Sequence, residues 1–385
     1  MRSAFPDPWL RLYALKANGL PPLVSELPGL GYGAGAVSGG ELALAGRAGF
    51  PLAQTALEGI GKTPADLRRA VAAAAAGTPL LWVSLESAAE AGALAGLVRA
   101  ARGRRGVDPT LRLDCLVRLN PAVRPETQRG LAVGAGGSKF GVLAAELEGV
   151  IAAGGGPDGP LRWRGIHVHV GSQLGAVDAW RAGFRAGLSA LRLRRAALPD
   201  FDTLDAGSGF PVTIEESPTP AHFARAAAEA LAEPGADRPL RLAVEPGRAV
   251  VARSGWLLAR VLHVREREPR QVVLDAGMGE LIRPALYGAV HPMAALTVRG
   301  RPVTDPQPGA VAVRVDGPIC ESTDTFGEAR LPPVRRGDLV AIGHAGAYAS
   351  AMASTYNGRP RPPEIAWDGA GVVLLRRRGS AVALP

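Results

Sequence analysis

The chain has little cysteine, little lysine and no long apolar run. Its 385 residues include two cysteines, Cys115 and Cys320, which are too few for a disulfide framework and favour a reducing compartment. No stretch reaches the ~18 uninterrupted apolar residues of a membrane span, and residues 1–10 lack the apolar core of a secretory signal. We therefore expect a cytoplasmic protein with no membrane partner. With 47% apolar and 21% charged residues, the composition excludes a disordered or fibrous chain.

The scarcity of lysine limits the chemistry that the chain can perform. All but three of its 44 basic residues are arginines, and the lysines are Lys16, Lys62 and Lys139. The net charge of +9 raises the possibility of nucleic-acid binding, but the basic runs are short, lie far apart and lack interleaved aromatic residues. We therefore expect no nucleic-acid partner. An enzyme that needs an amine nucleophile has three candidates here.

Up to about residue 250, short apolar or β-branched runs alternate with Ala-, Leu- and Arg-rich segments of helical spacing. Strands are predicted at residues 11–17, 33–38, 54–59, 80–85, 113–119, 165–170, 203–206 and 240–244. Helices are predicted at residues 40–49, 64–76, 87–101, 144–153, 177–197 and 220–232. Eight strands with intervening helices over ~250 residues predict a TIM (β/α)8 barrel. A doubly wound open sheet is the alternative, although it usually has fewer strands.

The pattern changes after Arg248. Val- and Leu-rich runs separated by Pro/Gly turns follow at residues 249–264, 271–276, 311–315 and 339–342, with few helical stretches between them. This texture predicts a mainly β domain. The fold class is therefore α/β, with a TIM barrel in residues 1–248 followed by a β-rich C-terminal domain in residues 249–385.

Polar or glycine-rich segments follow many of the predicted barrel strands, at the end where TIM barrels hold their reactive groups. They are Lys16 and residues 38–41, 59–62, 169–172, 207–209 and 245–248. A lysine, glycine turns and a carboxylate around one opening suggest a phosphate-bearing cofactor held by backbone N–H groups. A desolvated lysine with a lowered pKa can form a Schiff base with an aldehyde cofactor, although a lysine at a strand end can also simply reach solvent.

Seven motifs, in this order, closely resemble those of the pyridoxal-phosphate decarboxylases of the alanine-racemase-like fold. They are Tyr13-Ala14-Leu15-Lys16-Ala17-Asn18, His169-Val170-Gly171-Ser172-Gln173, Asp205-Ala206-Gly207-Ser208-Gly209, Glu245-Pro246-Gly247-Arg248, Arg283-Pro284-Ala285-Leu286-Tyr287, Cys320-Glu321-Ser322-Thr323-Asp324 and Ala345-Gly346-Ala347-Tyr348. The resemblance covers about residues 5–364. It implies the fold given above and pyridoxal 5′-phosphate (PLP) as the cofactor.

The resemblance also implies roles for individual residues. Lys16 is expected to form the Schiff base with PLP, and Cys320 to supply a proton in catalysis. His169 would stack on the pyridine ring, with Ser172 near the phosphate. Glu245 would face the pyridine nitrogen and keep it protonated, so that the ring can accept an electron pair. The remaining cofactor contacts expected from the motifs are Gly207, Ser208, Gly209, Gly247, Arg248 and Tyr348.

For the substrate, the resemblance implies a small amino acid with a carboxylate at its far end. Arg283 and Tyr287 would clamp that carboxylate and Glu321 would pair with the distal ammonium group, while Arg248 and Tyr348 would also contact the substrate. The expected reaction converts meso-2,6-diaminopimelate to L-lysine and carbon dioxide. In the family, the segment with Cys320 and Glu321 reaches into the neighbouring subunit, which implies a homodimer with shared active sites.

Two motifs allow another function. Residues 56–63 nearly match a P-loop, but Ala56 stands where the tight turn needs glycine, and Pro64 suggests a helix that begins after Thr63 as its cap. The closely spaced His167 and His169 could belong to a metal site. The sequence shows no further ligands at a compatible spacing, and we expect no metal.

Other functions of similar proteins also stay open. They are decarboxylation of ornithine, arginine or an intermediate of siderophore or antibiotic production, amino-acid racemisation, and an inactive regulatory homologue. Gly35 and His344 each stand where many relatives have an aspartate, which weakens the assignment of the substrate. Only fifteen residues precede Lys16, so we expect either that the start is assigned too late or that the β domain lacks a strand.

Overall fold

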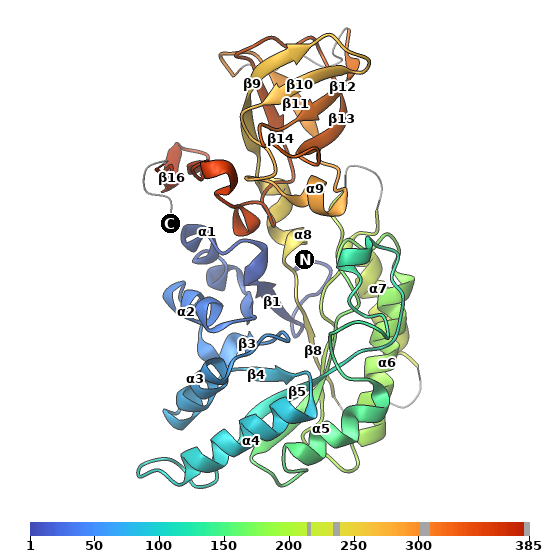
Figure 1. Cartoon of the computed structure of the whole chain (residues 1–385). Coiled ribbons are helices and arrows are strands. Elements are labelled where there is room, and N and C mark those ends of the chain that lie inside the picture. The colour runs from blue at the N-terminus through green and yellow to red at the C-terminus, as the bar shows by residue number, and fades with distance from the viewer. Residues whose placement is uncertain (214–216, 234–238, 301–308, 381–385) are drawn as a thin grey trace. The chain divides into compact units, whose positions relative to one another are not determined.

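The computed structural model describes residues 1–213, 217–233, 239–300 and 309–380 (Figure 1). The chain divides into two compact units, one formed by Met1–Pro211 and Ser217–Gly247 and the other mainly by the chain from Arg248 onward. Among the described residues, no helix combines the length and apolar character needed to cross a membrane.

The first unit is a closed barrel of eight parallel strands arranged in chain order. The barrel closes where Leu10 of the first strand pairs with Ala243 of the last. This arrangement confirms the predicted TIM barrel and excludes the doubly wound sheet. The strands are β1 (Leu10–Ala14), β2 (Gly33–Ala36), β3 (Thr55–Leu57), β4 (Trp82–Leu85), β5 (Leu113–Leu119), β6 (Leu161–Val168), β7 (Thr203–Asp205) and β8 (Arg241–Val244).

Helices follow most of these strands, and their small apolar faces pack against the barrel. In α4, for example, Leu94 and Val98 are fully buried, as expected when apolar residues recur every three to four positions. A second cluster of buried residues lies within the barrel and includes Leu12, Trp82 and Leu116. The helices of this unit are α1 (Pro21–Val24), α2 (Gly39–Arg47), α3 (Pro64–Ala75), α4 (Ala88–Arg102), α5 (Leu147–Ala153), α6 (Asp178–Arg194) and α7 (Pro220–Leu231).

The second unit has a six-stranded sheet and a separate two-stranded hairpin. The sheet order is β11-β14-β9-β10-β12-β13, and only β10 and β12 pair in parallel. Its core contains Val261, Val272, Val315 and Val340. The strands are β9 (Leu257–Arg265), β10 (Arg270–Leu274), β11 (Met293–Leu296), β12 (Val311–Asp316), β13 (Thr325–Leu331), β14 (Leu339–Ile342), β15 (Glu364–Trp367) and β16 (Val372–Arg376), and the helices are α8 (Arg248–Val251) and α9 (Arg283–Tyr287).

The prediction for the second unit was partly wrong. The apolar run at residues 249–264 begins with helix α8 and a 3₁₀ turn at Ala252–Ser254, and becomes a strand only at Leu257. A continuous apolar run does not distinguish a buried helix from a buried strand. Strands β11, β13, β15 and β16 were not predicted, because they are short or carry polar and glycine residues.

Candidate active site

Lys16 lies in a 3₁₀ turn at Leu15–Ala17 that directly follows β1. Leu15 and Ala17 are buried, whereas Lys16 is exposed. The sequence suggested a desolvated amine, and the structure does not show one. The turn points its two apolar neighbours into the core and leaves the lysine outside. The positive charge of Lys16 nevertheless favours the ionised form of Glu58 and Glu245, although burial and acidic neighbours leave the pKa of Glu58 above its usual value.

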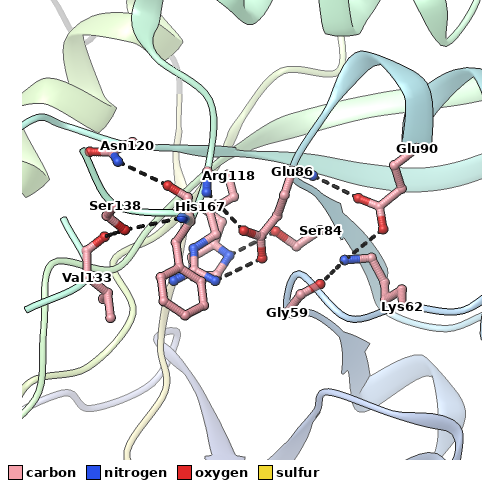
Figure 2. A network of polar contacts seen from close by, with 12 residues as sticks. Gly59, Lys62, Ser84, Glu86, Glu90, Arg118, Asn120, Val133, Ser138 and His167 are labelled. Atoms are coloured by element: carbon pink, nitrogen blue, oxygen red, sulfur yellow. Dashed lines mark hydrogen bonds and ion pairs between the residues drawn. The ribbon is translucent and has the colours of Figure 1, made fainter. Parts of the chain in front are cut away.

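The other two lysines have partners of their own. The side chain of Lys62 is wholly buried, its Nζ lies 3.1 Å from Oε1 of Glu90, and it donates a hydrogen bond to the carbonyl of Gly59 (Figure 2). The ammonium group of Lys139 lies 5.2 Å from the centroid of the Phe140 ring. Lys62 therefore belongs to a partly buried ion pair. Of the three lysines, Lys16 is the one whose charge acts on the buried carboxyl groups of Glu58 and Glu245.

The start of α3 excludes the P-loop interpretation. Thr63 caps this helix, and the Asp66 carboxylate accepts the main-chain N–H groups of Thr63 and Gly39, at 2.8 Å each. A P-loop offers such N–H groups to a phosphate. Here a carboxylate of the protein already occupies the helix N-terminus.

A buried acidic cluster lies at the carboxyl ends of three barrel strands. Glu245 directly follows β8, Glu58 directly follows β3, and His167 is near the end of β6; all three are at least nine-tenths buried. Nε2 of His167 lies 3.3 Å from Oε1 of Glu245. One ligand atom from each residue lies within 4.8 Å of the others, a spacing that a metal ion could also use. Of the two histidines considered for a metal site in the sequence, only His167 is part of this three-residue cluster.

The environment sets the charges of this cluster. Burial lowers the pKa of His167 to about 4 despite the neighbouring Glu245, so the imidazole is neutral at pH 7. Burial by itself would raise the pKa of Glu245, but His167, a hydrogen bond from Glu58 and the charge of Lys16 hold it below its usual value. Glu245 is therefore a buried carboxylate with a net negative charge at neutral pH.

His167 is also held from the opposite side of its ring. Oγ of Ser84, on β4, lies 2.8 Å from Nδ1 of His167. Close by, Nη1 of Arg118 lies 2.9 Å from Oε1 of Glu86 (Figure 2). Oε2 of Glu86 also accepts the main-chain N–H of Gly141. This second buried pair joins the ends of β4 and β5 to the loop that follows, and the sequence reasoning missed it.

His169 and the glycine turn after β7 contact each other directly. Nδ1 of His169 accepts the main-chain N–H of Ser208 at 3.0 Å, and burial lowers the pKa of His169 to about 3. Gly207 has a φ of +62°, and a Cβ there would lie 2.6 Å from Nδ1 of His169. Gly209, with a φ of +129°, would place a Cβ 2.4 Å from Leu174. Both positions therefore require glycine because of the packing around them. This requirement exists whether or not a phosphate approaches the turn.

Ser172 lies in a loop that is tied down through its main chain. Its N–H donates to the carbonyl of Leu131 at 3.1 Å, and its carbonyl accepts the hydroxyl of Thr127 at 2.6 Å. The serine is thus fixed in position beyond β6, on the same side of the barrel as His169.

These residues fit PLP by their chemistry. Within the described part of the chain, no N–H group donates a hydrogen bond to Oε1 of Glu245, although this oxygen is buried. A protonated ring nitrogen would satisfy it. Lys16 supplies an accessible amine, His169 supplies a neutral aromatic ring, and the turn at residues 207–209 supplies glycine backbone at the same end of the barrel.

The second unit gathers two arginines and two tyrosines. The guanidinium carbon of Arg248 lies 4.7 Å from the centroid of the Tyr348 ring. Burial, together with the charge of Arg248, lowers the pKa of Arg283 to about 10, while Tyr348 and Tyr287 act in the opposite direction. These are four of the five residues predicted to contact the substrate. The fifth, Glu321, is exposed.

Cys320 and Glu321 lie on the surface of the second unit. Cys320 is the exposed free thiol, whereas Cys115 is buried in the barrel, where burial raises the pKa of its thiol. Oε1 of Glu321 accepts the hydroxyl of Tyr356 at 2.6 Å. The structure therefore leaves Cys320 accessible for a role as a proton donor.

The sequence reasoning also missed Glu58 and His291. An acidic residue at the end of an otherwise apolar predicted strand was a signal for Glu58, which we passed over in favour of the glycines that follow it. His291 lies in a connection between α9 and β11, and nothing in the sequence pattern pointed to it.

A closed parallel barrel with a lysine, a neutral histidine and a buried carboxylate at the carboxyl ends of its strands suits a PLP-binding enzyme. Residues 1–252 match the family described as pyridoxal-dependent decarboxylase, pyridoxal binding domain. The chain belongs to this family and is a PLP-dependent carboxy-lyase.

The chain is similar to its relatives over nearly its whole length. The diaminopimelate decarboxylase of Aquifex aeolicus is 33% identical, over 98% of this chain and 85% of its own length. That of Deinococcus radiodurans is 35% identical, over 95% of this chain and 86% of its own length. The crystal structure of diaminopimelate decarboxylase from Helicobacter pylori complexed with L-lysine matches with a TM-score of 0.86 and 30% identity, over 99% of this chain and 90% of that one.

Proposed function

We propose that this protein decarboxylates meso-2,6-diaminopimelate to L-lysine and carbon dioxide. The observation that carries the proposal is the buried Arg283, which forms no ion pair with any described carboxylate and neighbours Tyr287. A buried guanidinium without a carboxylate suits an anionic group of the substrate. The relatives are diaminopimelate decarboxylases, and one of them binds L-lysine, the expected product.

In this proposal the barrel, residues 1–248, holds the cofactor. Lys16 would bind PLP covalently through Nζ, Glu245 would accept a hydrogen bond from the pyridine nitrogen, and neutral His169 would stack on the ring. When bound, PLP supplies an electron sink for the pair left at Cα as carbon dioxide departs. The remaining cofactor contacts that we propose are Ser172, Gly207, Ser208, Gly209, Gly247, Arg248 and Tyr348.

Substrate binding is assigned to Arg248 and residues 249–385. Arg283 would bind the distal carboxylate through its planar pair of N–H groups, with Tyr287 beside it. Glu321 would bind the distal ammonium group, in an orientation kept by Tyr356. Arg248 and Tyr348 would complete the substrate contacts, and Cys320 would donate a proton to Cα.

We further propose a homodimer in which Cys320 and Glu321 serve the active site of the neighbouring subunit, so that the C-terminal domain completes both the active site and the dimer interface. A mixture of two inactive variants tests this sharing: Lys16→Ala and Cys320→Ala should recover partial activity when they form mixed dimers. The cytoplasmic location is still a prediction from the sequence alone.

The decisive experiment is a carbon dioxide release assay with PLP on meso-diaminopimelate, ornithine, arginine and lysine in parallel. We expect the highest kcat/KM for diaminopimelate. A higher value for ornithine or arginine would reassign the substrate. Release from none of them, with PLP bound, would identify an inactive homologue or a different substrate.

A further inference from the structure

Glu58 is a buried carboxyl group that the proposed function does not use. Its main-chain N–H donates to the carbonyl of Ala36 at 2.8 Å, which continues the pairing of β2 and β3 by one residue and fixes the direction of the side chain. Only 5% of the residue is exposed. Oε1 of Glu58 accepts a long hydrogen bond, 3.5 Å, from the indole N–H of Trp82.

Gly35, on β2, adjoins this carboxyl group. A Cβ at Gly35 would lie 3.8 Å from Oε2 of Glu58 and 3.8 Å from the carbonyl oxygen of Tyr13, which is an ordinary contact distance. Gly35 on β2 and the Glu58 carboxyl group after β3 are therefore direct neighbours in the barrel.

Glu58 and Glu245 bring two buried carboxyl groups close together, with one oxygen of each within 4.8 Å of the other. Their carboxyl groups are hydrogen-bonded to each other, and such a bond requires a proton on one of them because a carboxylate can only accept. Burial, Glu245 and Asp205 raise the pKa of Glu58, against the smaller opposite effect of Lys16. Since the pKa of Glu58 is raised and that of Glu245 is lowered, a proton shared by the two groups would reside on Glu58.

Building on the proposed role of Glu245, we propose that Glu58 is a positioning residue for the cofactor. As a neutral carboxylic acid it donates a hydrogen bond to Glu245, and thereby keeps that carboxylate ionised and oriented for the pyridine nitrogen of PLP. The pair carries one negative charge, which matches one pyridinium, whereas two adjacent buried carboxylates would repel each other. The charged or titratable groups that face the pair are Asp205, His167, His169 and Lys16.

Two variants of similar size separate this role from simple packing. In Glu58→Gln the amide can still donate to Glu245, whereas in Glu58→Met the donor is lost. Because a hydrogen bond to a charged group contributes ~1.5–3 kcal/mol, we expect Glu58→Met to raise the apparent Kd for PLP by ~10-fold or more. We expect Glu58→Gln to keep the wild-type affinity and the wild-type pH dependence of the visible absorption of the bound cofactor, and Glu58→Met to shift that pH dependence.

A second measurement detects the proton without the cofactor. Infrared spectra of the apoprotein with carbon-13 in its glutamates should show the carbonyl stretch of a protonated carboxylic acid at pH 7. This band should be absent from Glu58→Gln. The label excludes Asp205, whose pKa is also raised by burial.

The outcomes distinguish this inference from the proposed function. Equal loss of affinity in both variants, unchanged behaviour of both, or absence of the infrared band would overturn the role of Glu58. Failure of the wild type to bind PLP, or full PLP affinity in Glu245→Ala, would instead overturn the cofactor assignment on which this inference rests.

Discussion

Nε2 of His291 lies 3.2 Å from Nη1 of Arg283, and Nδ1 of the same ring lies 2.8 Å from the carbonyl oxygen of Gly343. A guanidinium can only donate and a carbonyl can only accept, so Nε2 accepts and Nδ1 carries the hydrogen. Burial lowers the pKa of His291 to about 4, which agrees with this neutral form. His291 therefore fixes one end of the Arg283 guanidinium and leaves its other N–H groups for a carboxylate.

This contact predicts a substrate-binding defect when the acceptor is lost. In His291→Gln the side-chain oxygen can still accept from Arg283, whereas in His291→Leu nothing can. We expect His291→Leu to raise the KM for diaminopimelate by ~10-fold, since a lost hydrogen bond to a charged group costs ~1.5 kcal/mol or more, with a smaller change in kcat. Steady-state kinetics of both variants check this, and equal KM values for the two would refute the positioning role.

Replacing the arginine itself should change substrate discrimination. Arg283→Ala removes the only charged partner proposed for the distal carboxylate, so we expect kcat/KM for diaminopimelate to fall by ~100-fold, from the loss of a charged pair worth ~2–5 kcal/mol. Ornithine has no distal carboxylate and should be affected much less. The measurement is the ratio of kcat/KM values for the two substrates. An unchanged ratio would contradict the assignment of Arg283.

Substitution of each of the three lysines should have a different effect on activity, cofactor binding and stability. Lys16→Ala should abolish carbon dioxide release and the visible absorption of bound PLP. Lys62→Met leaves the partly buried Glu90 carboxylate without its partner, so we expect a loss of stability of ~1–3 kcal/mol but a retained absorption band. Lys139→Ala should change neither property. Absorption spectra and urea unfolding of the three purified variants provide the comparison, and a normal band in Lys16→Ala would refute the cofactor attachment.

The buried histidines predict loss of stability in acid. The pKa of His291 is about 4 in the folded chain and ~6.5 in the unfolded chain, so between these values the unfolded chain binds the extra proton. The stabilisation is therefore present above pH ~6.5 and is lost as the pH falls toward 4. Glu58 and Asp205, with raised pKa values, act with the opposite sign.

For this reason the informative quantity is a difference between two proteins. The free energy of unfolding of the wild type, minus that of His291→Gln, should decrease between pH 7 and pH 4, as measured by urea unfolding at several pH values. A difference that does not depend on pH would show that His291 is not neutral in the folded chain.

Most of the barrel was predictable because its secondary structure follows apolar periodicity. The strand at residues 113–119 and the helix beginning at Pro64 were predicted with the correct starts, since local capping and alternation mark such boundaries. The run at residues 249–264 was ambiguous, because its apolar residues suit a buried helix as well as a strand. Only packing in the second unit divides it at Leu257.

The candidate site was predictable to a smaller extent. Motifs identified Lys16, His169 and Glu245, because each follows a strand whose carboxyl end must face the barrel opening. They did not identify Glu58 or His291, whose partners lie far away in the sequence. Nor did the sequence show that Lys16 is exposed, since the orientation of a turn residue depends on which neighbours are buried.

The amino-acid sequence by itself determined the eight βα units, the order of the motifs and hence the family, because periodicity and spacing are local properties of the chain. The tertiary structure alone decided which charges meet. Barrel closure brings the ends of β3 and β8, almost two hundred residues apart, close enough for one oxygen of Glu58 to lie within 4.8 Å of one of Glu245. Both carboxyl groups are buried, and their different charged neighbours determine which of the two has the higher pKa. Proton affinity depends on surroundings, and surroundings exist only in the folded protein.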